Sequence, residues 1–240
     1  MLSRDNLEKF TKLQQTSVQN VVREYCQHLF LSFLYQNPGS EKLLFKGGTA
    51  LRIILKSPRF SEDLDFTGVN ITHKEIEELF TDTLANIEKT GMAVHVEEAT
   101  KTTGGYLGLA VFEAYDLKIN VQIEVSLRKG KVFKKTRALI TSDYIPAYTL
   151  VHLDLEDIIE GKLEALVDRH KPRDFYDYFF LLSGDYPAAR TKDNLKKVLK
   201  LLQKETTNFQ AELKKFLPAS QAMHLREFKK ILEEKISKYL

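Results

Sequence analysis

A pair of glycines followed closely by a pair of aspartates constrains this sequence more than any other feature. Gly47 and Gly48 lie between a short apolar run and a predicted short helix, and Asp63 and Asp65 lie in the predicted strand 60–66. Side chains alternate along a strand, so the two aspartates share one face, with Cα atoms roughly 6.5–7 Å apart. Either motif alone is usually only a turn or a solvated strand end. Together they predict an acidic site beside a tight backbone turn.

The two carboxylates suit a hard divalent cation. Mg²⁺ takes oxygen ligands, usually one or two carboxylates together with substrate phosphates. The glycines let the backbone approach a phosphate, and the helix that follows offers free N–H groups. Thr49 can cap that helix or contact a phosphate, and Arg59 and Ser61 add phosphate-binding side chains. We therefore expect Mg²⁺ (or Mn²⁺) on Asp63 and Asp65, and a nucleotide at Gly47, Gly48, Thr49, Arg59 and Ser61.

A third carboxylate, Glu124, lies on the predicted strand 117–128. This strand alternates apolar and polar residues, and Glu124 is the only acid on its polar face. If the strand lies beside the acidic strand, Glu124 can complete a three-carboxylate cluster for two metal ions. The alternative is that Glu124 faces water on a half-exposed sheet. The spacing leaves both possibilities open.

A lysine and two aspartates are further candidates in the C-terminal part. Lys162 falls inside the apolar arc of the predicted helix 154–170, where an ammonium group needs water or an anion. A nucleotide phosphate and a side chain that extends to water are both compatible with this position. Asp174 and Asp177 lie one turn apart in the next helix. Asp174 can complement the positive end of that helix, or the pair can activate an attacking hydroxyl or fix Lys162 or Arg173.

The pattern of predicted elements indicates an α+β fold. We expect a mixed sheet with flanking helices over residues 1–150, and a helical domain that completes the site over 151–240. Thr72 and Glu75 have the spacing of a capping box. The strands are expected at 43–45, 60–66, 92–99, 106–115 and 117–128. The helices are expected at 5–35, 49–56, 72–90, 154–170, 173–183, 191–204, 207–216 and 220–238.

The composition says more about the cellular compartment of the protein than about its function. The 240 residues are 43% hydrophobic and 29% charged, and the formal net charge of +3 is compatible with an RNA partner without requiring one. A single cysteine, Cys26, cannot form an internal disulfide, which favours a reducing compartment. No stretch approaches the roughly 20 apolar residues of a membrane span, and the N-terminus has no signal-peptide core. We expect a cytoplasmic protein without a membrane partner.

Four motifs in order resemble the AbiEii/AbiGii toxin family of the DNA polymerase β-like nucleotidyltransferase superfamily. The resemblance spans residues 43–182. Its motifs are 46–52 (Lys-Gly-Gly-Thr-Ala-Leu-Arg), 59–66 (Arg-Phe-Ser-x-Asp-Leu-Asp-Phe), 162–165 (Lys-Leu-x-Ala) and 173–177 (Arg-Asp-x-x-Asp). By motif position the family implies metal binding by Asp63 and Asp65, nucleotide contacts at Gly48 and Thr49, and catalytic roles for Lys162 and Asp174.

The resemblance also implies an activity and a setting. It implies Mg²⁺-dependent transfer of a nucleoside monophosphate from an NTP, and the related MenT-type toxins add nucleotides to the 3′ end of tRNA. The genetic setting would be a toxin–antitoxin or abortive-infection system with a cognate antitoxin. Transfer to a protein or small molecule, or a nucleotide-binding module without turnover, are the alternatives. The third superfamily carboxylate varies in this family, and only Glu124 fits it here.

The C-terminal region has no motif that maps onto the family, but it is rich in lysine. These lysines could form a surface that faces RNA, or could only be a solvated helical face. They are Lys192, Lys196, Lys197, Lys200, Lys204, Lys214, Lys215, Lys229 and Lys230.

Overall fold

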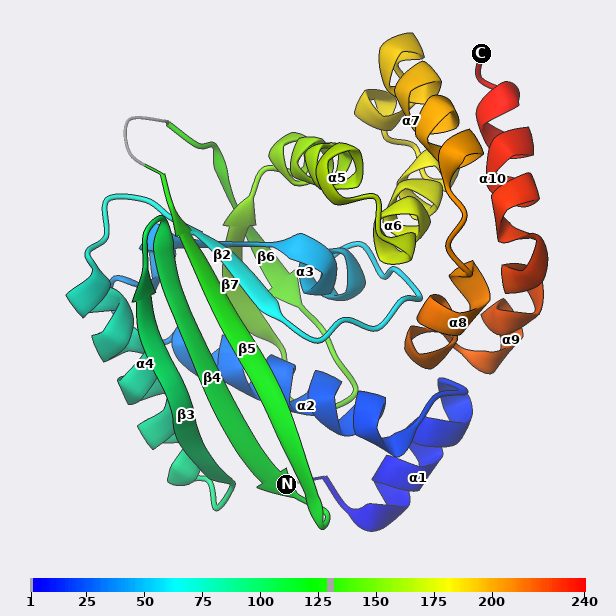
Figure 1. Cartoon of the computed structure of the whole chain (residues 1–240). Coiled ribbons are helices and arrows are strands. Elements are labelled where there is room, and N and C mark those ends of the chain that lie inside the picture. The colour runs from blue at the N-terminus through cyan, green and yellow to red at the C-terminus, as the bar shows by residue number, and fades with distance from the viewer. Residues whose placement is uncertain (1, 129–131) are drawn as a thin grey trace. The chain divides into compact units, whose positions relative to one another are not determined.

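The structure is a computed structural model that describes residues 2–128 and 132–240 (Figure 1). The chain separates into two compact units. Unit 1 consists of Met1–Lys56 and Phe60–Asp154, and unit 2 consists of Ser57–Arg59 and Leu155–Leu240. Unit 2 therefore includes three residues from the loop that precedes the aspartate pair.

A mixed sheet forms the centre of unit 1, with seven strands among the described residues in the order β3-β4-β5-β2-β1-β7-β6. β1 pairs antiparallel with β2 and parallel with β7, β2 pairs parallel with β5, and the remaining pairs are antiparallel. The strands are β1 (Leu43–Lys46), β2 (Leu64–Gly68), β3 (Ala93–Thr102), β4 (Gly105–Ala114), β5 (Leu117–Leu127), β6 (Lys135–Ile140) and β7 (Tyr148–Leu153).

Helices α2 and α4 pack against one face of this sheet (Figure 1). Phe80 of α4 contacts the ring of Tyr106 in β4, which is in register with Val125 of β5. Phe66 of β2 pairs with Val125 and lies on the same buried face. Asp65 therefore lies on the opposite face. The helices of unit 1 are α1 (Arg4–Leu13), α2 (Val18–Leu34), α3 (Gly47–Ile53) and α4 (His73–Glu88), with a 3₁₀ turn at Ser40–Lys42.

The regular elements of unit 2 within the described residues are all helices or 3₁₀ turns, joined by loops. Phe209 of α8 contacts Phe175 of α6 and Phe228 of α10, so aromatic rings join three of its helices. The helices are α5 (Leu155–Arg169), α6 (Pro172–Ser183), α7 (Lys192–Lys204), α8 (Phe209–Leu213), α9 (Ala219–Ala222) and α10 (Phe228–Ser237). Short 3₁₀ turns lie at Pro187–Arg190, Lys214–Phe216 and Met223–Glu227.

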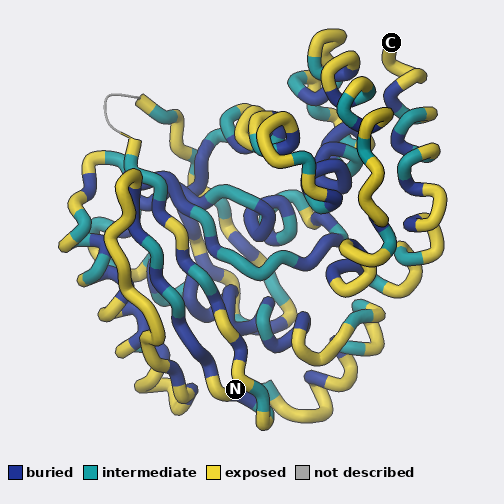
Figure 2. The backbone as a smooth tube through the Cα atoms, in the orientation of Figure 1, coloured by how far each residue is buried: buried dark blue, intermediate teal, exposed yellow. Residues whose placement is uncertain are grey.

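The predicted α+β class is confirmed, as are two local predictions. Thr72 caps α4 and forms a complete capping box with Glu75. β5 alternates as expected, with Ile119, Val121, Ile123 and Val125 buried and Glu124 exposed. The outer strand β3, which β4 separates from β5, is exposed along nearly all of its length (Figure 2). The strands expected at 106–115 and 117–128 are β4 and β5, and a tight turn at Tyr115 and Asp116, with positive φ angles of 54° and 63°, joins them.

The acidic strand is shorter at its start than the predicted 60–66. β2 begins at Leu64, because the preceding carbonyl groups are bound by side chains and not by a neighbouring strand. The Gln27 amide donates to the carbonyls of Ser61 and Glu62, each at 3.0 Å, and the Thr49 hydroxyl donates to the carbonyl of Asp63 at 2.5 Å. Asp63 therefore lies just before the strand and Asp65 lies within it.

Strands β6 and β7 were not predicted, and several helix boundaries differ. β7 is largely buried and lacks a two-residue alternation, and β6 is a short edge strand with a weak one. The predicted helix 5–35 is interrupted before Val18, where Ser17 caps α2. The predicted helix 49–56 is α3, which starts directly at Gly47. The predicted helices 207–216 and 220–238 are each divided into shorter helices and 3₁₀ turns.

Candidate active site

The glycine turn between β1 and α3 lies directly against the Asp65 carboxylate. Gly47 has a φ of +84°, and an ideal Cβ built on it would be 1.9 Å from Oδ2 of Asp65. A side chain at this position would overlap the carboxylate, so the close approach requires glycine as well as the left-handed backbone. The antiparallel register of β1 and β2, in which Lys46 pairs with Asp65, produces this approach. The predicted juxtaposition of an acid and a glycine turn is therefore present.

The loop leading to Asp63 is held by buried side chains of unit 1. Thr49 is fully buried, and its hydroxyl bonds to the Asp63 carbonyl. Gln27 of α2 is 2% exposed and holds the carbonyl of Ser61. Gln27 was not predicted as a site residue. A buried amide within an apolar helical stretch was the only sequence signal that could have identified it.

The same loop is also fixed by the Arg52 side chain of α3. The Arg52 guanidinium lies 4.0 Å from the ring centroid of Phe60. It also forms a 2.7 Å ion pair with Glu24, which Tyr144 supports through a 2.8 Å hydrogen bond. Buried aromatic and charged groups on α2 and α3 therefore position the segment that carries the aspartates.

Glu124 is the neighbour of Asp65 on the adjacent strand. β2 and β5 are parallel, with Asp65 in register with Glu124, so the two side chains lie on one face of the sheet with strands about 4.8 Å apart. Glu124 is exposed, and the Gln122 amide donates to its carboxylate at 2.5 Å. No group of three or more His, Cys, Asp or Glu side chains within the described residues is arranged to hold a metal ion. A third metal ligand at Glu124 stays a prediction.

A cation of unit 1, Lys46, was missed as a site residue. It pairs in register with Asp65, and its ammonium lies 3.4 Å from the hydroxyl of Ser126, two residues after Glu124 on β5. Lys46, Asp65, Glu124 and Ser126 therefore share one sheet face. The signal was present in the sequence, because Lys46 directly precedes the glycine turn.

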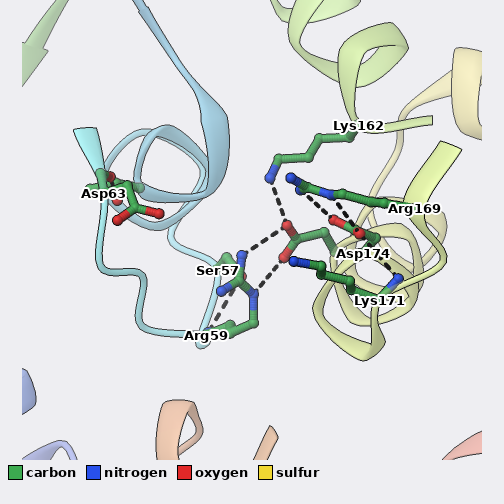
Figure 3. A network of polar contacts seen from close by, with 9 residues as sticks. Ser57, Arg59, Asp63, Lys162, Arg169, Lys171 and Asp174 are labelled. Carbon is green, nitrogen blue, oxygen red and sulfur yellow. Dashed lines mark hydrogen bonds and ion pairs between the residues drawn. The ribbon is translucent and has the colours of Figure 1, made fainter. Parts of the chain in front are cut away.

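In unit 2, two cations converge on one buried carboxylate (Figure 3). Asp177 accepts a bidentate pair from Arg59, at 2.7 and 2.9 Å, and a 2.8 Å bond from Lys162. Burial alone would raise the pKa of Asp177, but Arg59 and Lys162 outweigh burial and lower this pKa to about 2. Burial would lower the pKa of Arg59, and its contact with Asp177 raises it instead.

This cluster gives Arg59 and Lys162 a defined role within unit 2. The Arg59 side chain is 4% exposed and that of Lys162 is 10% exposed. Among the roles considered from sequence, the fixing of Lys162 by an aspartate of the 173–177 motif is observed, and that aspartate is Asp177. The predicted nucleotide contacts of Arg59 and Lys162 are not tested by this geometry and stay predictions.

Asp174 caps the N-terminus of α6. Its carboxylate accepts two bonds from Arg169, at 2.9 and 2.7 Å, and one from the backbone N–H of Lys171 at 3.3 Å. Asp174 is 1% exposed, so its buried carboxylate is neutralised by Arg169 and by the positive end of the helix (Figure 3). A catalytic role for Asp174 remains a prediction.

Within residues 2–128 and 132–240, no helix combines the length and the apolar character that crossing a membrane requires.

Comparison with known proteins identifies a matching family model and two similar folds. The model described as "Nucleotidyl transferase AbiEii toxin, Type IV TA system" matches residues 29–239. A crystal structure of a candidate nucleotidyltransferase from H. pylori is 19% identical, with a TM-score of 0.59, over 93% of this chain and 99% of that one. The crystal structure of JHP933 from Helicobacter pylori is 20% identical, with a TM-score of 0.58, over 93% and 95%. No protein with curated function matches this sequence.

Proposed function

This chain belongs to the nucleotidyl transferase AbiEii toxin family, a type IV toxin–antitoxin family, and we propose that it transfers a nucleoside monophosphate from an NTP to RNA. The nucleotidyltransferase activity and the toxin–antitoxin setting follow from the family. The acceptor, the metal and the residues that serve them are the proposal. We take the 3′ end of a tRNA as the acceptor and the reducing cytoplasm as the compartment.

The observation that carries the proposal is the Asp65 carboxylate packed against the Gly47 turn. Carboxylate oxygens are the donors that a hard divalent cation prefers, and the turn leaves no room for a side chain beside them. The residues therefore fit Mg²⁺ or Mn²⁺, with Asp63 and Asp65 as ligands and Glu124 as a candidate third ligand. When bound, the cation would neutralise phosphate charge and orient the triphosphate.

The reaction is in-line displacement at the α-phosphate of the NTP. The acceptor hydroxyl oxygen forms a bond to the α-phosphorus, the bond from that phosphorus to the bridging oxygen breaks, and pyrophosphate leaves. The backbone N–H groups at Gly47 and Gly48 bind phosphate oxygens at the start of α3. Thr49 holds the carbonyl of Asp63, and Lys46 supplies positive charge on the Asp65 face.

Residues of unit 2 enter the proposal through the family motifs. Lys162 and Arg59 contribute positive charge that offsets the charge developing on the phosphates, and Asp177 orients both cations. Asp174 orients the acceptor hydroxyl or accepts its proton. Ser61 adds a phosphate contact. Variants of Lys162 and Asp174 test these assignments one residue at a time.

The type IV assignment implies a cognate antitoxin. The antitoxin is expected to counteract the effect of nucleotidyl transfer in the cell.

The test is incubation of the protein with each α-³²P-labelled NTP and Mg²⁺ together with total RNA, total protein or a small-molecule pool. Label is expected in RNA of tRNA size, and pyrophosphate is expected to be released in equal amount. The Asp63→Ala variant is the control and should leave the RNA unlabelled. Label that appears only in protein or in a small molecule would refute the RNA acceptor, and no Mg²⁺-dependent labelling of any acceptor would refute the mechanism.

A further inference from the structure

Four lysines form a row along the outward face of helix α7. They are spaced four residues apart, so they share one side of the helix at steps of about 6 Å. The row consists of Lys192, Lys196, Lys200 and Lys204, and all four are exposed. Leu195, Val198 and Leu202 hold the opposite side of α7 in the core of unit 2. We call the four residues the α7 lysine row.

The α7 lysine row carries uncompensated positive charge. Within the described residues, none of its four side chains forms an ion pair or a hydrogen bond. Three other exposed lysines are paired: Lys12, Lys74 and Lys101 each have a carboxylate oxygen within 4.0 Å. The only acid on α7 is Asp193. Four unpaired ammonium groups on one helix repel one another, and an anionic ligand removes that repulsion.

The neighbouring helix bounds the row with negative charge. Glu160, Glu164 and Asp168 are exposed along α5, which contacts α7. A groove of about 410 Å³ lies between the two helices, and it is lined by Glu164 and Asp168 from α5 and by Lys197 from α7. Lys197 therefore faces acids and is not part of the row. The acids of α5 repel a polyanion, so the electrostatic attraction is strongest on the outward side of α7.

We propose that the α7 lysine row binds the phosphate backbone of the RNA acceptor. This inference rests on the proposed function and adds the surface that holds the acceptor. Lysine is a flexible, strongly hydrated point charge that binds phosphates without reading sequence. A second protein chain fits the row less well, because lysine is depleted in protein interfaces and no large exposed hydrophobic side chain lies on α7.

The test compares two triple variants with the same change in net charge. The first is Lys196→Gln with Lys200→Gln and Lys204→Gln, and the matched control is Lys12→Gln with Lys74→Gln and Lys101→Gln. Affinity for total tRNA is measured without NTP over a series of salt concentrations. The first variant should bind at least about 10-fold more weakly, and its log–log salt slope should be smaller in magnitude by about 2. The control should match the unaltered protein.

Unchanged tRNA affinity and salt slope in the first variant would overturn the inference, and so would an equal loss in the control. Sedimentation of both variants detects a role for the row in self-association. A change in oligomeric state with unchanged tRNA binding would also overturn it. Failure of this inference can be distinguished from failure of the proposed function, because tRNA binding is measured without nucleotide transfer. A protein that bound tRNA through the row and transferred no nucleotide would refute only the proposed reaction.

Discussion

The Asp65 carboxylate occupies the space that a side chain on Gly47 would enter. A Cβ at Gly47 would be 1.9 Å from Oδ2 of Asp65, and Gly47 has a φ of +84°. The carboxylate and the backbone turn therefore depend on each other. A substitution in the turn should therefore displace Asp65, the proposed metal ligand, while leaving its carboxylate chemically unchanged.

Gly47→Ala is predicted to abolish nucleotidyl transfer while the protein still folds. Alanine in the left-handed region costs about 1–2 kcal/mol, and its Cβ would displace Asp65. Gly91→Ala is the matched control, because Gly91 has the same φ of +84° and nothing lies within 4 Å of its Cβ. Both variants should lose stability in urea unfolding, Gly47→Ala by more because Asp65 must also move, and only Gly47→Ala should lose activity by about 100-fold or more. Equal activity in the two variants would contradict the role of the turn.

Lys46→Met is predicted to weaken NTP use without unfolding unit 1. Lys46 is in register with Asp65 and lies 3.4 Å from Ser126, so its charge is expected to act on a bound triphosphate. We expect KM for the NTP to rise about 10-fold, which corresponds to about 1.4 kcal/mol of binding. Lys118→Met removes an exposed lysine of β5 that pairs with Glu113, and it should leave KM unchanged. An unaltered KM in Lys46→Met would remove this residue from the site.

The Arg59–Asp177 pair should show strong energetic coupling. Removing one partner leaves a charge buried, which costs about 3–5 kcal/mol. We therefore expect Asp177→Ala and Arg59→Ala each to destabilise the protein strongly in urea unfolding. The double variant should cost clearly less than the two single changes together. Strict additivity would show that the 2.7 Å ion pair contributes no coupling.

The parts of the site that could be predicted are those set by residues close together in the sequence. The glycine turn beside Asp65 and the alternation of β5 are local patterns, and each is set by spacing along one segment. Asp63 was predicted to share a strand face with Asp65, but it lies just before β2 begins. The placement of Glu124 beside Asp65 was one of two open possibilities. The strand register decided that placement, because the two residues come from separate parallel strands.

Long-range contacts could not be predicted from spacing. Arg59 is buried against Asp177, which is 118 positions away. Periodicity says nothing about such pairs. Gln27 was missed for the same reason, since its partners are backbone carbonyls of a loop 34 and 35 positions later. β7 was missed because it is largely buried and has no alternating pattern.

His28 is predicted to make the protein acid-sensitive between pH 6.5 and 4. It is buried and bonded to the Tyr148 hydroxyl at 2.9 Å, and burial lowers its pKa to about 4. The unfolded chain binds a proton below pH 6.5 and the folded chain does so only near pH 4, so acid favours unfolding across this window. The loss should approach about 3 kcal/mol.

Urea unfolding at a series of pH values tests this prediction. His28→Gln should flatten the pH dependence between 6.5 and 4, and substitution of the exposed His95 by Gln should leave it unchanged. A second decline below pH 4 is expected in all three proteins. It follows from Asp177, whose pKa is lowered to about 2, so that its contribution is lost as the pH falls from about 4 to 2. A pH profile unaffected by His28→Gln would contradict the assignment.

The most direct test of the account is the Mg²⁺ dependence of transfer in Asp63→Asn and Asp65→Asn. Asparagine keeps the size of the side chain and removes its charge, so the fold should be retained while the cation is lost. We predict that labelled nucleotide transfer to RNA falls about 100-fold or more in each variant, with urea unfolding midpoints close to that of the unaltered protein. Full Mg²⁺-dependent transfer by a folded Asp65→Asn protein would contradict the central claim that this aspartate pair holds the catalytic metal.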